Sequence, residues 1–352
     1  MKDLRILLLS GVRHGASYAA TFRGLRGVEL VGVAEQESAP AWALQDSAAL
    51  ASRFELPLVD LEDGIEQSDA VIVCSEPTRH VQLAVLALSA GRHVLMDKPA
   101  ALRVEEARAL EKAVQAAPTM VLTAIHRLGS PSVRRARRLI DDGEIGLPLL
   151  VSAEWIAAGG LDGTSVERAE LVCDPALSGG GELVNFGWYP FLAIPYLTGL
   201  AVEEVSVFAR SLFGGPHRHY GVEDSAVLSL GLHHGATATL MVTRAPVGVS
   251  NLPLSSRMTI VGSHGAIVID EDAPYLQLRT GTTVERRTLC GPSGEYAIQS
   301  CAKEFVAAIR GETGVTVGIR EILDVAAVFD ACRASNQDGK SVKVQVVEDE
   351  RG

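Results

Sequence analysis

The stretch His93-Val94-Leu95-Met96-Asp97-Lys98-Pro99 decides the fold of this chain of 352 residues. Four residues that suit a β-strand run into a carboxylate, an ammonium group and a proline. Residues 79–90 before it and 104–117 after it carry apolar side chains at helical spacing. A short apolar strand between two amphipathic helices is the unit of a parallel, doubly wound sheet. Because such sheets bind ligands at the carboxyl ends of their strands, Asp97 and Lys98 are expected at a ligand-binding crevice.

Length and composition indicate a soluble protein of two domains. A chain of 352 residues is too long for one ordinary hydrophobic core. Apolar residues make up 47% and charged residues 21%, which is typical of a globular protein. The formal net charge is −11 and is spread out, so no basic surface for nucleic acid is expected. No apolar run approaches the roughly 20 residues needed to span a bilayer, so no membrane partner is expected either.

Cysteine and histidine usage favours a cytoplasmic protein without a metal. The five cysteines are an odd number and form no CxxC pair, which suggests reduced thiols rather than disulfides. The amino-terminal apolar run is too short for a signal peptide. Four histidines in two short groups lack carboxylate or thiolate partners at ligand spacing, so no metal site is expected. These histidines are His217, His219, His233 and His234.

The loop after the first expected strand is a degraded dinucleotide motif. That strand covers residues 6–9 and leads into a helix over residues 15–25. A dinucleotide-binding fingerprint would place glycines at positions 10, 12 and 15, and only Gly15 fits. Val12 stands where the middle glycine normally lets the backbone approach the pyrophosphate. We expect Gly11 to provide the close approach instead.

Charged groups near this loop predict NAD as the cofactor. The helix that starts at Gly15 offers free N–H groups to an anion, and Arg13 and His14 add positive charge. Glu35 ends the next expected strand, where an acidic side chain accepts hydrogen bonds from the adenosine ribose. No Arg or Lys follows directly to neutralise a 2′-phosphate, so NADP is less expected. The alternative for Glu35 is a surface residue that closes a strand.

The string from Gly91 to Pro99 resembles the AGKHVLCEKP signature of the Gfo/Idh/MocA family, the glucose–fructose oxidoreductases and inositol dehydrogenases. Asp97 stands where that family usually has Glu. Residues 75–80 resemble the family's TPNxxH loop, which lies along the nicotinamide side of the cofactor, and Pro77 and His80 match it. The cofactor-binding residues expected in this half are Gly11, Val12, Arg13, His14, Gly15, Glu35, Ser75, Glu76, Pro77, His80, Asp97 and Lys98.

The resemblance continues into the second half and sets the expected fold class, α/β. Residues 124–127, with Pro131 after them, resemble the family's NYRFxP segment. Arg127 stands at the position where relatives have an arginine near the substrate pocket. Later segments alternate apolar and polar residues, as antiparallel strands with one covered face do. We expect an N-terminal Rossmann doubly wound parallel sheet over residues 1–122. A C-terminal α+β domain with a largely antiparallel open sheet should follow over residues 123–352.

Residues 179–190, GGGELVNFGWYP, resemble the family motif GGGxLxDxGxHxxD. Asn185 replaces the Asp, Tyr189 the catalytic His, and Leu192 the second Asp. Some family members use a tyrosine in place of that histidine, so the resemblance implies Tyr189 as the acid/base. A phenol has an ordinary pKa of about 10, which a nearby ammonium, that of Lys98, would lower. The alternative for Tyr189 is a half-buried aromatic residue that only packs.

The resemblance implies an NAD-dependent oxidoreductase. Hydride would pass between nicotinamide and a secondary alcohol or ketone of a sugar, inositol or related polyol. Lys98 and Tyr189 would be catalytic, and Arg127, Asn185 and Trp188 would bind the substrate. A homodimer or homotetramer through the C-terminal sheet is also implied.

Two other functions and one other role stay open. A non-catalytic dinucleotide-binding sensor is favoured by Val12, Asn185 and Leu192, which depart from the family motifs. The other is an NAD-dependent glycoside hydrolase, as some relatives are. Such an enzyme would keep the cofactor bound, with no net oxidation or reduction of it. Lys98 itself could be a solvated turn lysine, and a cis peptide bond is expected before Pro99 because proline permits one.

Overall fold

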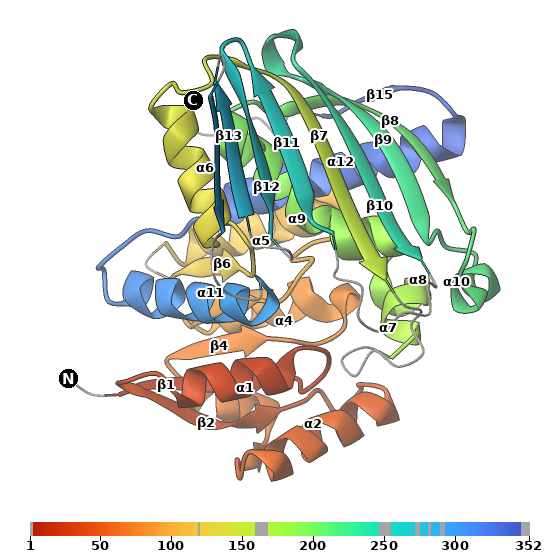
Figure 1. Ribbon diagram of the computed structural model, residues 1–352. Coiled ribbons are helices and arrows are strands. Elements are labelled where there is room, and N and C mark those ends of the chain that lie inside the picture. Colours follow the sequence, from red (N-terminus) through yellow and green to blue (C-terminus); the bar gives the residue numbers. More distant parts are fainter. Residues whose placement is uncertain are drawn as a thin grey trace. The chain divides into compact units, whose positions relative to one another are not determined.

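The computed structural model describes residues 3–118, 120–158, 168–245, 255–271, 275–280, 283–288 and 293–345. The chain forms two compact units (Figure 1). The first consists of Met1–His126 with Ile298–Leu323, and the second of Arg127–Ala297 with Asp324–Gly352. Residues 298–323 therefore belong to the first unit, although the sequence analysis placed everything after residue 122 in the second.

The first unit contains a six-stranded sheet in the order β3-β2-β1-β4-β5-β6, and every neighbouring pair is parallel. Its strands are β1 (Leu4–Leu9), β2 (Val28–Ala34), β3 (Leu58–Val59), β4 (Ala70–Val73), β5 (His93–Met96) and β6 (Leu122–Ala124). Its helices include α1 (Gly15–Arg23), α2 (Ala41–Arg53), α3 (Leu61–Gln67), η1 (Pro77–Arg79), α4 (His80–Ser89) and α5 (Val104–Ala116). This is the strand order of the dinucleotide-binding Rossmann fold, so the expected fold class is confirmed for this half.

Helix α11 (Ser293–Ile309) explains why a late segment belongs to the first unit. Its residues Cys301, Ala302 and Phe305 are buried in one apolar cluster with Tyr18 and Phe22 of α1. The backbone carbonyl of Val317 also accepts bonds from the Thr123 hydroxyl, at 2.8 Å, and from the Ala124 amide, at 3.3 Å. The amphipathic pattern of α11 predicts a helix, but it does not reveal which core the helix completes.

The second unit contains a nine-stranded sheet in the order β14-β13-β12-β11-β7-β10-β9-β8-β15. Its strands are β7 (Pro148–Ala158), β8 (Val202–Arg210), β9 (Ser225–Leu232), β10 (Thr237–Ala245), β11 (Arg257–Gly262), β12 (Gly265–Asp270), β13 (Tyr275–Thr280), β14 (Thr283–Thr288) and β15 (Val342–Lys343). Only the β7–β10 pair is parallel among these strands, so the expected largely antiparallel sheet is confirmed.

Helices cover one face of this sheet, with α9 against β7, β9 and β10 and α6 against β12 and β13 (Figure 1). The helices of this part are α6 (Pro131–Asp141), α7 (Glu170–Cys173), α8 (Pro175–Ser178), α9 (Glu182–Thr198), α10 (Gly215–Tyr220), η2 (His233–Gly235) and α12 (Ile319–Asp338), the last of which begins in the first unit. Buried and exposed residues alternate along β8 and β9, which places one row of side chains in the core and the other in solvent.

The structure also bears on membrane spans, metal sites and disulfides. Within the described residues, no helix combines the length and the apolar character needed to cross a membrane. The same residues contain no group of three or more His, Cys, Asp or Glu side chains that could hold a metal ion. Cys74, Cys301 and Cys332 are buried free thiols, Cys173 is also buried, and Cys290 lies outside the described residues.

Candidate functional site

The register of the parallel sheet brings four site segments to one edge. Leu9 pairs with Ala34 of β2 and with Val73 of β4, and Val73 pairs with Met96 of β5. The residues that come next along these strands therefore lie at the same carboxyl edge. They are Ser10, Glu35, Cys74 and Asp97.

Gly11, in the loop between β1 and α1, lets this loop pack closely against α2. A Cβ atom on Gly11 would lie 2.7 Å from the Cα of Ser47 in α2, and the Gly11 amide donates to the Ser47 hydroxyl at 2.8 Å. The missing side chain of Gly11 thus serves this packing, whereas a close approach to pyrophosphate stays a prediction. Val12 is only 1% exposed, so protein atoms cover the side chain that seemed an obstacle to the cofactor.

Helix α1 begins with backbone donors that no side chain caps. His14 occupies the N-cap position and makes no side-chain hydrogen bond to the first turn. The amides of Gly15 and Ser17 donate to the carbonyls of Val12, at 3.1 Å, and His14, at 2.9 Å, and the helix start carries the positive end of the helix dipole. This helix start can therefore receive a phosphate group, as the sequence analysis expected for the helix at Gly15.

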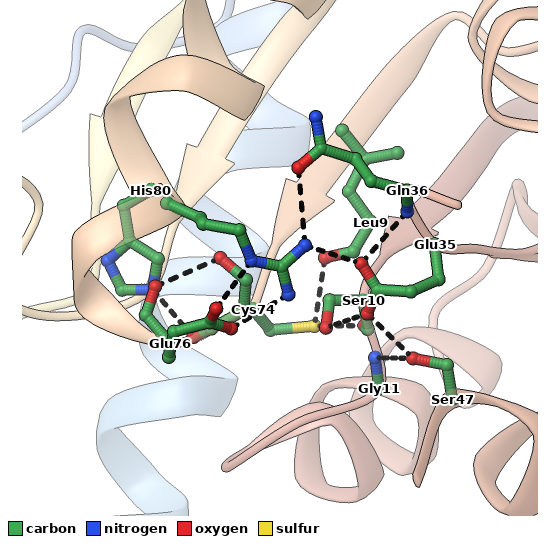
Figure 2. A network of polar contacts seen from close by, with 11 residues as sticks. Leu9, Ser10, Gly11, Glu35, Gln36, Ser47, Cys74, Glu76 and His80 are labelled. Atoms are coloured by element: carbon green, nitrogen blue, oxygen red, sulfur yellow. Dashed lines mark hydrogen bonds and ion pairs between the residues drawn. The ribbon is translucent and has the colours of Figure 1, made fainter. Parts of the chain in front are cut away.

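Glu35 lies at the centre of a dense hydrogen-bond network (Figure 2). Its Oε2 accepts from the hydroxyls of Ser10, at 2.6 Å, and Ser47, at 3.0 Å. Its Oε1 accepts from the Gln36 amide at 3.0 Å and from Nη1 of Arg79 at 2.8 Å. The Glu35 side chain is 3% exposed, so it is not a surface residue that merely closes a strand.

Arg79 is a functional candidate that the sequence analysis missed. It also binds both carboxylate oxygens of Glu76, with Nε at 2.5 Å and Nη2 at 2.7 Å. Burial opposes the charged guanidinium, but the hydrogen bonds and charges of Glu76 and Glu35 raise the pKa of Arg79. No Arg or Lys follows Glu35 directly in the sequence, but Arg79 places a cation beside it. The two residues are 44 positions apart, so local sequence gave no signal of the contact.

Asp97 ties the end of β5 to the start of α1. Its Oδ2 lies 2.8 Å from Nδ1 of His14, and its Oδ1 accepts from the Tyr18 hydroxyl at 3.0 Å. Burial alone would raise the pKa of Asp97, but the charge and hydrogen bond of His14 lower it well below the ordinary value. Asp97 and His14, both predicted to bind cofactor, are thus brought together in this first unit.

Lys98 is buried, with 3% of its surface exposed, which argues against a solvated turn lysine. The Lys98–Pro99 peptide bond is cis, as expected. His80 is fully buried, and its ring nitrogens lie 2.8 Å from the Pro99 carbonyl and 2.9 Å from the Ser75 carbonyl. His80 therefore joins the loop after β4 to the loop that carries Lys98. The other predicted residues of the first loop are also buried, namely Ser75, Glu76 and Pro77.

In the second unit the structure brings two predicted residues together. The rings of Trp155, on β7, and Tyr189, on α9, are stacked with centroids 5.8 Å apart. The guanidinium carbon of Arg127 lies 4.8 Å from the Tyr189 centroid and 5.7 Å from that of Trp155. Such contacts are favourable cation–π interactions, and they fix the orientation of the Tyr189 ring. Trp188, also predicted to bind substrate, is fully buried.

Asn185 belongs to a buried ionic cluster centred on Glu182. The Asn185 amide nitrogen donates to Oε2 of Glu182 at 2.9 Å. Oε1 of Glu182 accepts from Nε of Arg244 and lies 3.2 Å from Nε2 of His217. Burial would raise the pKa of Glu182, but Arg244 and the other partners lower it. His217 was considered only as a metal ligand, and the pairing of Glu182 with Arg244 was not foreseen, because these residues lie far apart in the chain.

Comparison with known proteins agrees with this geometry in both units. Residues 8–125 match the model of the oxidoreductase family with an NAD-binding Rossmann fold. Residues 133–268 match that of the GFO/IDH/MocA C-terminal domain, and together the two matches cover well over half of the chain. The chain belongs to the Gfo/Idh/MocA oxidoreductase family.

Individual family members match over different lengths. The chain is 24% identical to inositol 2-dehydrogenase from Rhizobium meliloti (strain 1021), over 97% of this chain and 99% of that protein. It is also 24% identical to uncharacterized oxidoreductase YrbE from Bacillus subtilis (strain 168), over 62% of this chain but only 58% of that protein. The solved structure of a levoglucosan dehydrogenase in complex with NADH has a TM-score of 0.81 at 19% identity, over 98% of this chain and 100% of that one.

The first unit fits the nicotinamide dinucleotide of the Gfo/Idh/MocA family. The strand order is that of dinucleotide-binding folds, and the site segments meet at the carboxyl edge of the sheet. The uncapped start of α1 suits the pyrophosphate, and the carboxylate of Glu35 suits a ribose hydroxyl that replaces one of its present donors. This oxidoreductase therefore has the donors and acceptors that such a cofactor needs.

Proposed function

We propose that this oxidoreductase is an NAD-dependent dehydrogenase that acts on a secondary alcohol, or its ketone, in a sugar, inositol or related polyol. The observation that carries the proposal is the match over nearly the whole chain to a protein named inositol 2-dehydrogenase. The likeness to a levoglucosan dehydrogenase fold supports the same substrate class. Lys98, buried at the carboxyl edge of the Rossmann sheet, supports a catalytic rather than a sensing role.

When bound, the nicotinamide accepts or donates the hydride. The chain's own residues bind and orient the substrate, and they move the hydroxyl proton. Lys98 holds the substrate oxygen, and Tyr189 exchanges the hydroxyl proton as general acid or base. Arg127 keeps the Tyr189 ring in place through its cation–π contact, and Asn185, fixed by Glu182, orients the substrate.

Absorbance of NADH during incubation with a panel of inositols, hexoses and glucosides tests the proposal. Lys98→Met should remove most turnover and leave NADH binding nearly unchanged, because the ammonium acts on the substrate. Lys112→Met, on the exposed side of α5, is the matched control and should keep full activity. Binding of NADH without turnover on any substrate would favour the sensor. Cleavage of an aryl glycoside without net NADH formation would favour the glycoside hydrolase.

We also propose that the protein forms a homodimer or homotetramer through the outer face of the nine-stranded sheet. Phe208 on β8 pairs with Val227 on β9, and these side chains are 64% and 54% exposed. Val227 in turn pairs with Met241 on β10, so apolar residues cross three strands on the face away from α9. Exposed apolar patches of this kind favour association. Phe208→Lys with Val227→Lys should lower the mass measured by analytical ultracentrifugation, and an unchanged mass would contradict this interface.

The free thiols of Cys74, Cys301 and Cys332 support a further proposal, that the protein works in a reducing compartment such as the cytoplasm. Cell fractionation followed by detection of the protein tests it. Recovery of the protein in an oxidising compartment would contradict it.

A further inference from the structure

The carboxylate of Glu35 has no spare acceptor site. A carboxylate offers about four lone-pair positions, and four donors already point at Glu35. Two are the hydroxyls of Ser10 and Ser47, one is the Gln36 amide, and the last is Nη1 of Arg79. A ribose hydroxyl that binds Glu35 must therefore replace one of these donors. The Gln36 amide is fixed by the backbone, whereas Arg79 is the donor with the longest and most adjustable side chain.

Arg79 can leave Glu35 without becoming a bare buried cation. Its Nε and Nη2 remain paired with the two oxygens of Glu76, three residues earlier in the chain. A planar guanidinium keeps this fork when the Glu76 side chain turns together with it, and Nη1 already has a second acceptor, Oε1 of Gln36, at 3.2 Å. The ion pair with Glu76 thus keeps the charge of Arg79 compensated when a ribose hydroxyl replaces Arg79 at Glu35.

Arg79 also changes the charge that a 2′-phosphate would meet. Glu35 and Glu76 alone would repel a phosphate, but the guanidinium between them cancels one of the two negative charges. Guanidinium groups bind phosphate well through parallel N–H donors. The same side chain therefore competes with a ribose hydroxyl for Glu35 and moderates repulsion of a phosphate.

We propose that Arg79 is a cofactor-specificity residue that narrows the preference for NAD(H) over NADP(H), with Glu76 as its anchor. The inference rests on the proposed NAD preference and names the residue that limits it. Arg79 weakens NADH binding through competition for Glu35, and it strengthens NADPH binding through its positive charge. Both effects move the ratio of the two dissociation constants in the same direction.

Fluorescence titration of the full-length protein with NADH and with NADPH measures this ratio without any substrate. Arg79→Met keeps an unbranched stem and removes the guanidinium and its charge, so the ratio of the NADPH to the NADH dissociation constant should rise about tenfold or more, since a charge-assisted hydrogen bond contributes that much. Glu76→Gln removes a negative charge and loosens the anchor, so the ratio should fall. Arg108→Met, which breaks an ion pair with Glu111 on α5, is the matched control and should leave the ratio unchanged.

A structural role for Arg79 would weaken both cofactors by the same factor, and a ratio within about twofold of wild type in both Arg79→Met and Glu76→Gln would overturn the inference. A ratio that falls in Arg79→Met would overturn it as well. Arg79→Lys, which keeps the charge, should retain most of the wild-type ratio and covers the case in which the methionine variant does not fold. Wild-type protein that binds neither cofactor would overturn the proposed function together with this inference, whereas tight NADH binding with an unmoved ratio would overturn the inference alone.

Discussion

Removal of the Arg244 side chain should destabilise the second unit strongly. Glu182 is fully buried, and Arg244 is its only cationic partner of fixed charge among the contacts described above. Arg244→Met would leave the carboxylate with Asn185 and His217, and would also end the contact of the guanidinium with the Phe186 ring, 5.1 Å away. Removal of one partner of a buried ion pair costs about 3–5 kcal/mol of unfolding free energy.

Urea denaturation followed by tryptophan fluorescence can measure this loss, because Trp155 and Trp188 both lie in the second unit. Arg210→Met removes an exposed arginine of the same unit and should change stability by less than about 0.5 kcal/mol. The double variant Glu182→Met with Arg244→Met should be more stable than Arg244→Met alone, because no bare carboxylate remains. A loss below about 1 kcal/mol in Arg244→Met, or simple additivity in the double variant, would refute the reasoning.

The dependence on pH has a definite sign. The folded-state pKa of Glu182 is lowered from 4.5, so its contribution to stability is present above that value and is lost as pH falls through the folded value. In Arg244→Met, burial is no longer opposed by the guanidinium and should raise the pKa of Glu182. The difference in stability between wild type and variant should therefore shrink when the pH is lowered from about 7 to about 5.

Tyr189→Phe should lower turnover by roughly 10²–10⁴-fold, the usual size of a general acid–base contribution, with a much smaller change in KM. Steady-state kinetics on the best polyol of the panel measures this, and full activity of the variant would make Tyr189 a packing residue. Gly11→Ala should weaken both folding and NADH binding, because the new Cβ would lie 2.7 Å from the Cα of Ser47. Thermal melts should show a loss relative to Gly215→Ala, where a Cβ meets nothing within 4 Å, and equal melting temperatures would show that the loop adjusts freely.

Much of the fold could be predicted because it depends on local patterns. The apolar strand before Asp97 and the helices on either side of it predicted the parallel sheet, and the register then placed Lys98 at its carboxyl edge. Strand and helix periodicities are properties of neighbouring residues, so a single sequence contains them.

The missing parts of the candidate site depend on contacts between distant residues. Arg79 binds Glu35 because the loops after β2 and β4 meet at the sheet edge. No sequence pattern in either loop predicts this ion pair. Arg244 reaches Glu182 from 62 positions further along the chain. Charged residues follow no period when they form such pairs, so their partners become visible only when the sheet order is known.

The division of the first unit between two distant chain segments has a consequence for protein synthesis. A ribosome that has released residues 1–126 has not yet supplied Cys301, Ala302 or Phe305, which pack against Tyr18 and Phe22. The core of the Rossmann unit therefore stays incomplete, with this apolar surface uncovered, until most of the second unit has been synthesised. Domains usually fold in the order of synthesis, but here the first core to begin cannot be the first to finish. A fragment that ends at residue 126 should accordingly aggregate, and co-expression of a peptide that contains residues 298–323 should improve its solubility.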